Sequence, residues 1–119
     1  MFKLIRDGIP ELIQQSGKVC NYAEVKNREF FIELLRAKFV EEINEFFTSG
    51  DVEELADVIL VAETFAEVLG QTREQFKELC ENKIATRGRF DNKYIIFLPD
   101  QPKSNISAST PVKPTEEAQ

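Results

Sequence analysis

Two amphipathic segments with a break between them constrain the fold more than any other feature of this sequence. Apolar side chains recur in each segment at intervals of three and four residues, the spacing of one helical face. The first segment, roughly 28–48, carries Ile32, Leu35, Phe39, Ile43 and Phe46. The second carries Val52, Leu55, Ile59, Ala62, Ala66 and Leu69. Because Thr48-Ser49-Gly50 interrupts the pattern, the sequence predicts an antiparallel helical hairpin with these stripes as its core.

The flanking segments predict further helices. A brief helix from Ile9 is expected to stop at Gly17. Thr72 and Gln75 have the spacing of a capping box and predict a third long helix, which ends near Arg87-Gly88. The run 94–98 is rich in β-forming residues. The predicted class is all-α, with a helical hairpin core and a third long helix.

The predicted domain covers 1–98 and is followed by a disordered tail, 99–119, which is rich in Pro, Ser, Thr and Lys. A domain of this size is near the lower limit for a self-sufficient core. Three helices rarely bury ten phenylalanines alone. We therefore expect paired hairpins that assemble into a helix bundle, as a homodimer or homotetramer.

Composition excludes several classes of function. A net charge of −6 argues against nucleic acid as a partner, which requires a basic surface. No apolar run is long enough for a membrane span, and two cysteines without a CxxC motif fit a reducing, cytoplasmic compartment. Histidine is absent, which excludes His-dependent triads and dyads. Any hydrolysis must use carboxylates, lysines, arginines or a metal ion.

A second stripe lies beside the core stripe on each hairpin helix. On the first helix it consists of Phe31, Leu34, Lys38, Glu42 and Glu45. On the second it consists of Glu54, Asp57, Val61, Phe65 and Val68. Each stripe is apolar far from the turn and acidic near it, a mirrored change that an ordinary solvated face would not show.

The register of the hairpin brings the acids of these stripes together. With a short turn at 49–50, Glu45 lies opposite Glu54 and Glu42 lies opposite Asp57. Like charges about 4 Å apart cost roughly 4 kcal/mol per pair at an effective dielectric near 20. The four acids must therefore be partly protonated or hold a divalent cation. An all-oxygen cluster suits Mg²⁺ or Mn²⁺.

Simpler roles are open for each acid. Glu54 stands three residues after Asp51, the expected N-cap, and could complete a cap. Glu42 and Glu45 could be surface carboxylates, with Lys38 as an ion-pair partner of Glu42. The mirrored quartet favours metal binding over these separate roles.

The acids also match a known motif. Glu41-Glu42-Ile43-Asn44-Glu45, followed by Glu54-Leu55-Ala56-Asp57, resembles the EExxE and ExxD signature of the MazG-like all-α nucleotide pyrophosphohydrolases, a superfamily that includes phosphoribosyl-ATP pyrophosphohydrolase. The opening 3–11, KLIRDGIPE, resembles the KLVRDKIPE start of one branch. Lys83 with Arg87-Gly88-Arg89-Phe90 resembles the end of that branch.

The resemblance implies a Mg²⁺-dependent enzyme that cleaves a nucleotide between its α- and β-phosphates. It makes the metal ligands Glu42, Glu45, Glu54 and Asp57. Glu41 would support the site or activate the attacking water. Three positions depart from the branch: Gly8 replaces a Lys, Arg89 replaces a Gly and Leu60 replaces a Glu. The first two bear on phosphate contacts and the third on the number of metal ions held.

The substrate is expected to be a nucleotide whose phosphates meet cationic side chains. The candidates for phosphate binding are Lys3, Arg6, Lys83, Arg87 and Arg89, each of which could also be a solvated surface charge. No P-loop or dinucleotide-binding motif occurs. A base could stack on one of the aromatic side chains Phe2, Phe30, Phe31, Phe65 or Phe90.

Two other functions fit the same sequence. The chain could be a non-catalytic acidic module that oligomerises and binds a nucleotide or a protein partner. Alternatively, the cation could be structural and only clamp the hairpin.

Overall fold

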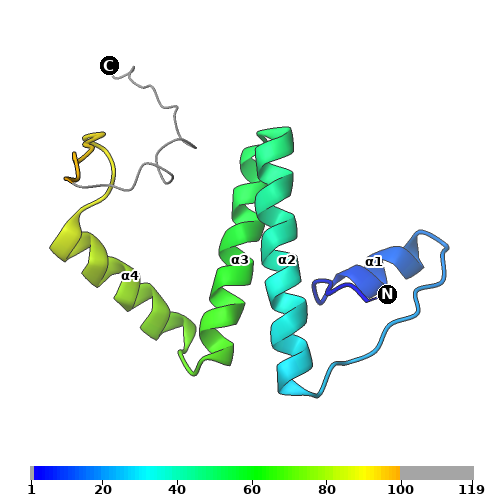
Figure 1. The fold of residues 1–119 in the computed structure, drawn as a ribbon. Helices are drawn as coiled ribbons and strands as arrows, with labels where there is room; N and C mark the ends of the chain where they lie inside the picture. The colour runs from blue at the N-terminus through cyan, green and yellow to red at the C-terminus, as the bar shows by residue number, and fades with distance from the viewer. Residues whose placement is uncertain (1, 100–119) are drawn as a thin grey trace. The chain divides into compact units, whose positions relative to one another are not determined.

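The computed structural model describes residues 2–99, which contain four helices and no strand (Figure 1). The helices are α1 (Ile9–Gln15), α2 (Arg28–Ser49), α3 (Val52–Val68) and α4 (Arg73–Arg87). This confirms the all-α class for the described part of the chain. The predicted disordered tail, 99–119, lies outside the described residues except for Pro99.

The chain divides into two compact units, the first ending at Cys80 and the second beginning at Glu81. The boundary falls within α4, whereas the sequence predicted one domain over 1–98. The second unit contains the run 94–98, which is irregular. An extended segment forms a sheet only when a neighbouring strand completes its hydrogen bonds, and residues 2–99 offer no such strand.

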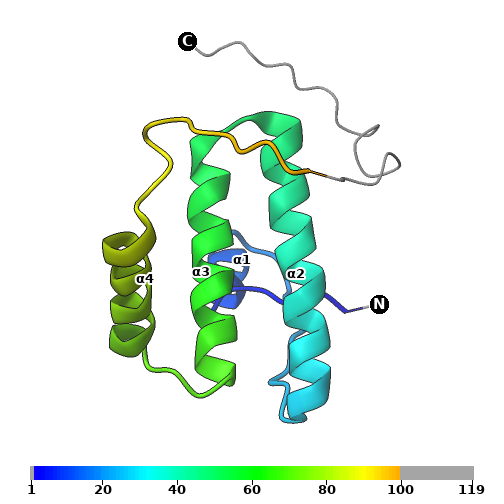
Figure 2. The same cartoon turned by 60° about the vertical axis from the view of Figure 1, so that its left-hand side comes forward.

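The helices α2 and α3 pack side by side as an antiparallel hairpin (Figures 1 and 2). Gly50 ends α2 with a φ of 69°, in the left-handed region that favours glycine, and its N–H donates to the carbonyl of Phe46 at 2.8 Å. Asp51 then caps α3, because its carboxylate accepts from the N–H of Glu53 at 3.3 Å. The predicted break and N-cap are confirmed.

The buried residues of α3 differ from the predicted core stripe. Of the predicted stripe, Val52, Ile59 and Leu69 are 71%, 58% and 70% exposed, and Ala66 is buried. Val61 of the neighbouring stripe is buried instead. Apolar spacing predicts that a helical face is buried. Where two adjacent faces are both apolar, it does not predict which of them packs against the other helix of the same chain. In this hairpin, an apolar face remains open on α3.

The capping box before α4 is confirmed. The Thr72 N–H donates to Oε1 of Gln75 at 2.9 Å, and the Gln75 N–H donates to Oγ1 of Thr72 at 3.1 Å. The short helix α1 begins with Pro10 in its first turn, and Gly17 follows it with a φ of 90°. Among residues 2–99, no helix is both long and apolar enough to cross a membrane.

Candidate metal centre

Three carboxylates from the two hairpin helices meet near the turn. Glu42 of α2 and the α3 residues Glu54 and Asp57 each place one oxygen within 4.8 Å of the other two. Glu42 is only 5% exposed, and the other two are half-buried. The hairpin register thus brings together three of the four side chains that the sequence predicted as metal ligands.

The fourth predicted ligand, Glu45, lies at the edge of this group. It is exposed and does not belong to the three converging carboxylates. Burial raises the pKa of Glu54, and the neighbouring Glu45 raises that pKa further. The raised pKa shows that a negative charge on Glu54 is unfavourable here, and a cation would offset that cost.

Two carboxylate oxygens in the cluster have no partner. Oε1 of Glu42 and Oε1 of Glu54 are shielded from solvent and accept no hydrogen bond from the described residues. Buried oxygens of this kind are costly and are normally satisfied by a donor, a water molecule or an ion. The three carboxylates offer the oxygen ligands that hard divalent cations take.

The contacts of Glu54 and Glu42 differ from those of a capping residue and of a solvated surface acid. The Asp51 N–H donates to Oγ of Ser49 at 3.0 Å, so the Glu54 side chain does not complete the predicted capping box. Lys38 does pair with Glu42, at 3.1 Å from Nζ to Oε2. This ion pair is largely buried rather than solvated, since the Lys38 side chain is 16% exposed. Glu42 is therefore not an ordinary surface carboxylate.

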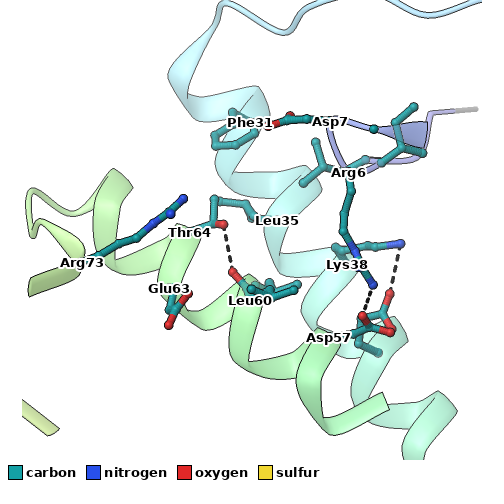
Figure 3. Close-up of a pocket in the computed structure, with 15 residues that line it drawn as sticks. Arg6, Asp7, Phe31, Leu35, Lys38, Asp57, Leu60, Glu63, Thr64 and Arg73 are labelled. Atoms are coloured by element: carbon teal, nitrogen blue, oxygen red, sulfur yellow. Dashed lines mark hydrogen bonds and ion pairs between the residues drawn. The ribbon is translucent and has the colours of Figure 1, made fainter. Parts of the chain in front are cut away.

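The segment before α1 brings two more cations to the cluster. Nζ of Lys3 lies 2.9 Å from Oε2 of Glu41, and the Arg6 guanidinium donates to Oδ1 of Asp57 (Figure 3). The hydrogen bond from Lys3 lowers the pKa of Glu41, and Glu41 raises the pKa of Lys3. Glu41 is therefore held in its ionised form, next to the converging acids.

A cavity of about 450 Å³ opens beside these acids (Figure 3). Its apolar wall consists of Leu4, Ile5, Phe31, Leu35, Leu60 and Val61. Glu42 and Asp57 line it together with Thr64 and Arg73. Asp57 and Thr64 are two turns apart on α3, which corresponds to about 10 Å along the helix. The cavity therefore has Glu42 and Asp57 at its acidic end near the hairpin turn and extends away from it, where the acidic residue Glu63 also lines it.

The five phenylalanines that are candidates for base stacking have different surroundings in the structure. Phe31 lines the cavity. Phe2 and Phe30 pack edge-on against each other with ring centroids 5.8 Å apart. Phe65 packs against an aromatic ring of α2, and Phe90 belongs to the second unit. Phe31 is thus the candidate that faces the site.

The predicted phosphate-binding residues fall into two groups. Lys3 and Arg6 contact the acidic cluster. Lys83, Arg87 and Arg89 belong to the second unit, so their role stays a prediction.

Sequence reasoning missed Arg73, which lines the cavity while its Nε pairs with Glu67 at 2.9 Å. A single arginine at the start of a helix gives no sequence signal of this placement. Gly8 and Leu60, two of the three positions that depart from the MazG-like branch, also line the cavity.

The first unit therefore belongs to the class of helical hairpins that carry a shared carboxylate cluster beside a cavity. No protein-family model, curated protein or solved structure matches the chain. The function proposed below rests on the carboxylates, the cations around them and the cavity.

Proposed function

We propose that this chain is a Mg²⁺-dependent nucleotide pyrophosphohydrolase of the MazG-like kind, which releases a nucleoside monophosphate and pyrophosphate. The observation that carries this proposal is the buried carboxylate of Glu42, which has an unpaired Oε1 and places one of its oxygens within 4.8 Å of oxygens of Glu54 and Asp57 beside the cavity. A cation bound among these carboxylates would satisfy the unpaired oxygen, and the cavity provides room for its ligand.

The residues that would hold Mg²⁺, or Mn²⁺ in its place, are Glu42, Glu54 and Asp57, with Glu45 at the edge of the site. A bound Mg²⁺ neutralises phosphate charge and lowers the pKa of a water molecule. The protein itself contributes the fixed positions of the carboxylates on two packed helices, and phosphoryl transfer depends mainly on such positioning.

Glu41 would support the site or activate the attacking water. It precedes Glu42 on α2, and Lys3 and Lys38, at 2.9 and 3.5 Å, hold its carboxylate in place. The hydrogen bond from Lys3 lowers the pKa of Glu41 and makes it a weaker proton acceptor, which favours the supporting role.

The cavity would take the nucleoside part of the substrate. Phe31 offers a ring for stacking, and base–aromatic stacking contributes about 1–3 kcal/mol. Lys3 and Arg6 lie at the acidic end of the site, where the phosphates would be held. A nucleotide bound in this way would extend from the hairpin turn along α3.

The functional form is proposed to be a homodimer or homotetramer. The register that aligns Glu42 with Asp57 also aligns Val40 with Ile59, which are 54% and 58% exposed. Phe47 and Val52 follow nearer the turn and are exposed as well. A second hairpin packed on this face would bury these side chains, at about 25 cal/mol per Å² of apolar surface.

The test is a panel of nucleoside triphosphates assayed for pyrophosphate release with and without Mg²⁺. The proposal requires release that depends on Mg²⁺ and is lost in Asp57→Asn, while the variant keeps its helical circular dichroism. A non-catalytic binding module would release no pyrophosphate from any nucleotide. If the cation is structural, chelation would unfold the chain instead of only stopping turnover.

A further inference from the structure

The three cationic side chains that pair with the carboxylate cluster differ in how exposed they are to solvent. Lys38 is part of α2, and its side chain is 16% exposed. Lys3 and Arg6 belong to the segment before α1, and their side chains are 62% and 60% exposed. Lys38 also pairs with two carboxylates of its own helix, Glu41 and Glu42, at 3.5 and 3.1 Å. Lys3 and Arg6 each pair with one carboxylate and lie mostly in solvent, so they exchange partners more readily.

The charges of the cluster are not balanced. Its five carboxylates are Glu41, Glu42, Glu45, Glu54 and Asp57. Three cations are paired with them, so the carboxylates outnumber the cations. The Arg6 guanidinium nevertheless occupies Asp57, one of the three converging carboxylates. A cation that takes Oδ1 of Asp57 must therefore compete with Arg6.

The position of Arg6 suits a second partner. Arg6 lines the same cavity as Asp57 and reaches it from the N-terminal segment (Figure 3). A guanidinium presents a planar set of donors that matches two phosphate oxygens at once. An Arg6 released from Asp57 would therefore find phosphate oxygens within the same site.

We propose that Arg6 exchanges partners, pairing with Asp57 in the ligand-free chain and with phosphate oxygens when a divalent cation and a polyphosphate are bound together. This inference rests on the proposed function. The cation frees Arg6, and the phosphate then accepts it. Because binding free energies are reciprocal, each ligand tightens the binding of the other. Arg6 acts here as a positioning residue that couples the two ligands.

The experiment measures binding, not turnover, with Mn²⁺ and inorganic pyrophosphate as probes. Mn²⁺ affinity is determined by electron paramagnetic resonance for the native chain, Arg6→Gln, Arg6→Lys and Glu42→Gln. The matched control is Arg36→Gln, an exposed position on α2 that forms no ion pair with residues 2–99. Pyrophosphate is then titrated at saturating Mn²⁺. Circular dichroism confirms that each variant is folded.

In Arg6→Gln, Mn²⁺ alone should bind roughly two- to fivefold more tightly, because a partly exposed competing ion pair is gone. Pyrophosphate should bind roughly tenfold more weakly in the presence of Mn²⁺, because a charge-assisted contact is lost. Arg6→Lys should lie between Arg6→Gln and the native chain, and Arg36→Gln should match the native chain.

Two failures can be told apart. Unchanged or weaker Mn²⁺ binding in Arg6→Gln would overturn the exchange, even if the native chain binds Mn²⁺ through Glu42. If the native chain shows no Mn²⁺ binding that Glu42→Gln removes, the metal site itself is absent, and both the proposed function and the exchange are overturned.

Discussion

The two sides of the α2–α3 hairpin differ from an ordinary protein surface and core in opposite ways. One side shields carboxylates from solvent, and the other exposes apolar side chains to it. Glu42 and Asp57 lie on the side with the cavity, where a buried and a half-buried carboxylate lie beside each other. Val40 and Ile59 stand two residues away from them, and residues two apart project from nearly opposite sides of a helix. On that far side, apolar side chains are exposed.

This contrast indicates that both sides lack a partner in the isolated chain. Buried unpaired carboxylate oxygens and large exposed apolar side chains are each costly in water, so each is informative where it occurs. The acidic side fits a cation and phosphates, and the apolar side fits a second copy of the hairpin. The predictions below test the two sides separately.

The largest effect is expected on the acidic side. Glu42→Gln keeps the shape of the side chain and removes its charge, so Mg²⁺-dependent pyrophosphate release should fall about a thousandfold, in line with the several kcal/mol that a catalytic metal contributes. Glu33→Gln, an exposed position on the same helix, is the control and should leave the rate unchanged. Equal rates in the two variants would contradict a role for the buried acid.

The next effect tests the apolar side. Ile59→Glu would place an unpaired charge in the proposed interface between hairpins, and such a charge costs about 3–5 kcal/mol when it is buried. Analytical ultracentrifugation should show that the variant self-associates with a dissociation constant at least a hundredfold higher than that of the native chain. Val19→Glu, at an exposed apolar position outside the hairpin helices, is the control. A native chain that sediments as a monomer would refute the interface.

A smaller effect concerns the stability of the chain when Mg²⁺ binds. At a Mg²⁺ concentration 100 times the Kd, the free energy of unfolding should rise by about 2.7 kcal/mol, because only the folded chain forms the site. Thermal unfolding of the native chain with Mg²⁺ and with a chelator measures this gain. Asp57→Asn should lose most of it. A chelated native chain that has no cooperative transition would favour a structural cation over a catalytic one.

The smallest effect is the pH dependence of stability caused by Glu54. Its pKa is raised in the folded chain, so the folded state holds the proton more tightly than the unfolded state does. Stability should therefore decrease as the pH rises from the ordinary pKa of glutamate, about 4.3, through the raised value. With a chelator present, Glu54→Gln should unfold at a higher temperature than the native chain at pH 7. The difference should vanish below about pH 4.

Glu41 should change the stability of the chain with pH in the direction opposite to Glu54. Its pKa is lowered by the hydrogen bond from Lys3, so its contribution to stability is present above the ordinary pKa of glutamate and is lost as the pH falls through the lowered value. Glu41→Gln should therefore lower the unfolding temperature at pH 7. The same sign of change in both variants would contradict these assignments.

The helices and their register could be predicted from the sequence because their signals are local. Gly50 ends one helix, Asp51 begins the next, and the reciprocal bonds of Thr72 and Gln75 follow from a spacing of three residues. Once the hairpin is fixed, the approach of Glu42 and Asp57 follows from the length of its turn. The convergence of the three acids could therefore be predicted from the sequence.

Other contacts depend on how the helices and loops pack against one another, and no local sequence pattern predicts them. Arg6 and Asp57 are 51 residues apart, and no spacing rule connects an extended segment to a helix. The exposure of Ile59 was missed because two adjacent stripes of α3 are both largely apolar, and only packing decides which of them meets α2. The placement of Arg73 in the cavity wall is a result of packing in the same sense.

The central claim is that the three converging carboxylates form one divalent cation site. Crystals grown with saturating Mn²⁺, with diffraction recorded at an energy where manganese scatters anomalously, test this directly. The account predicts an anomalous peak coordinated by oxygens of Glu42, Glu54 and Asp57, with Arg6 no longer paired with Asp57. A chain that binds Mn²⁺ only at other residues, or shows no peak between α2 and α3, would contradict it.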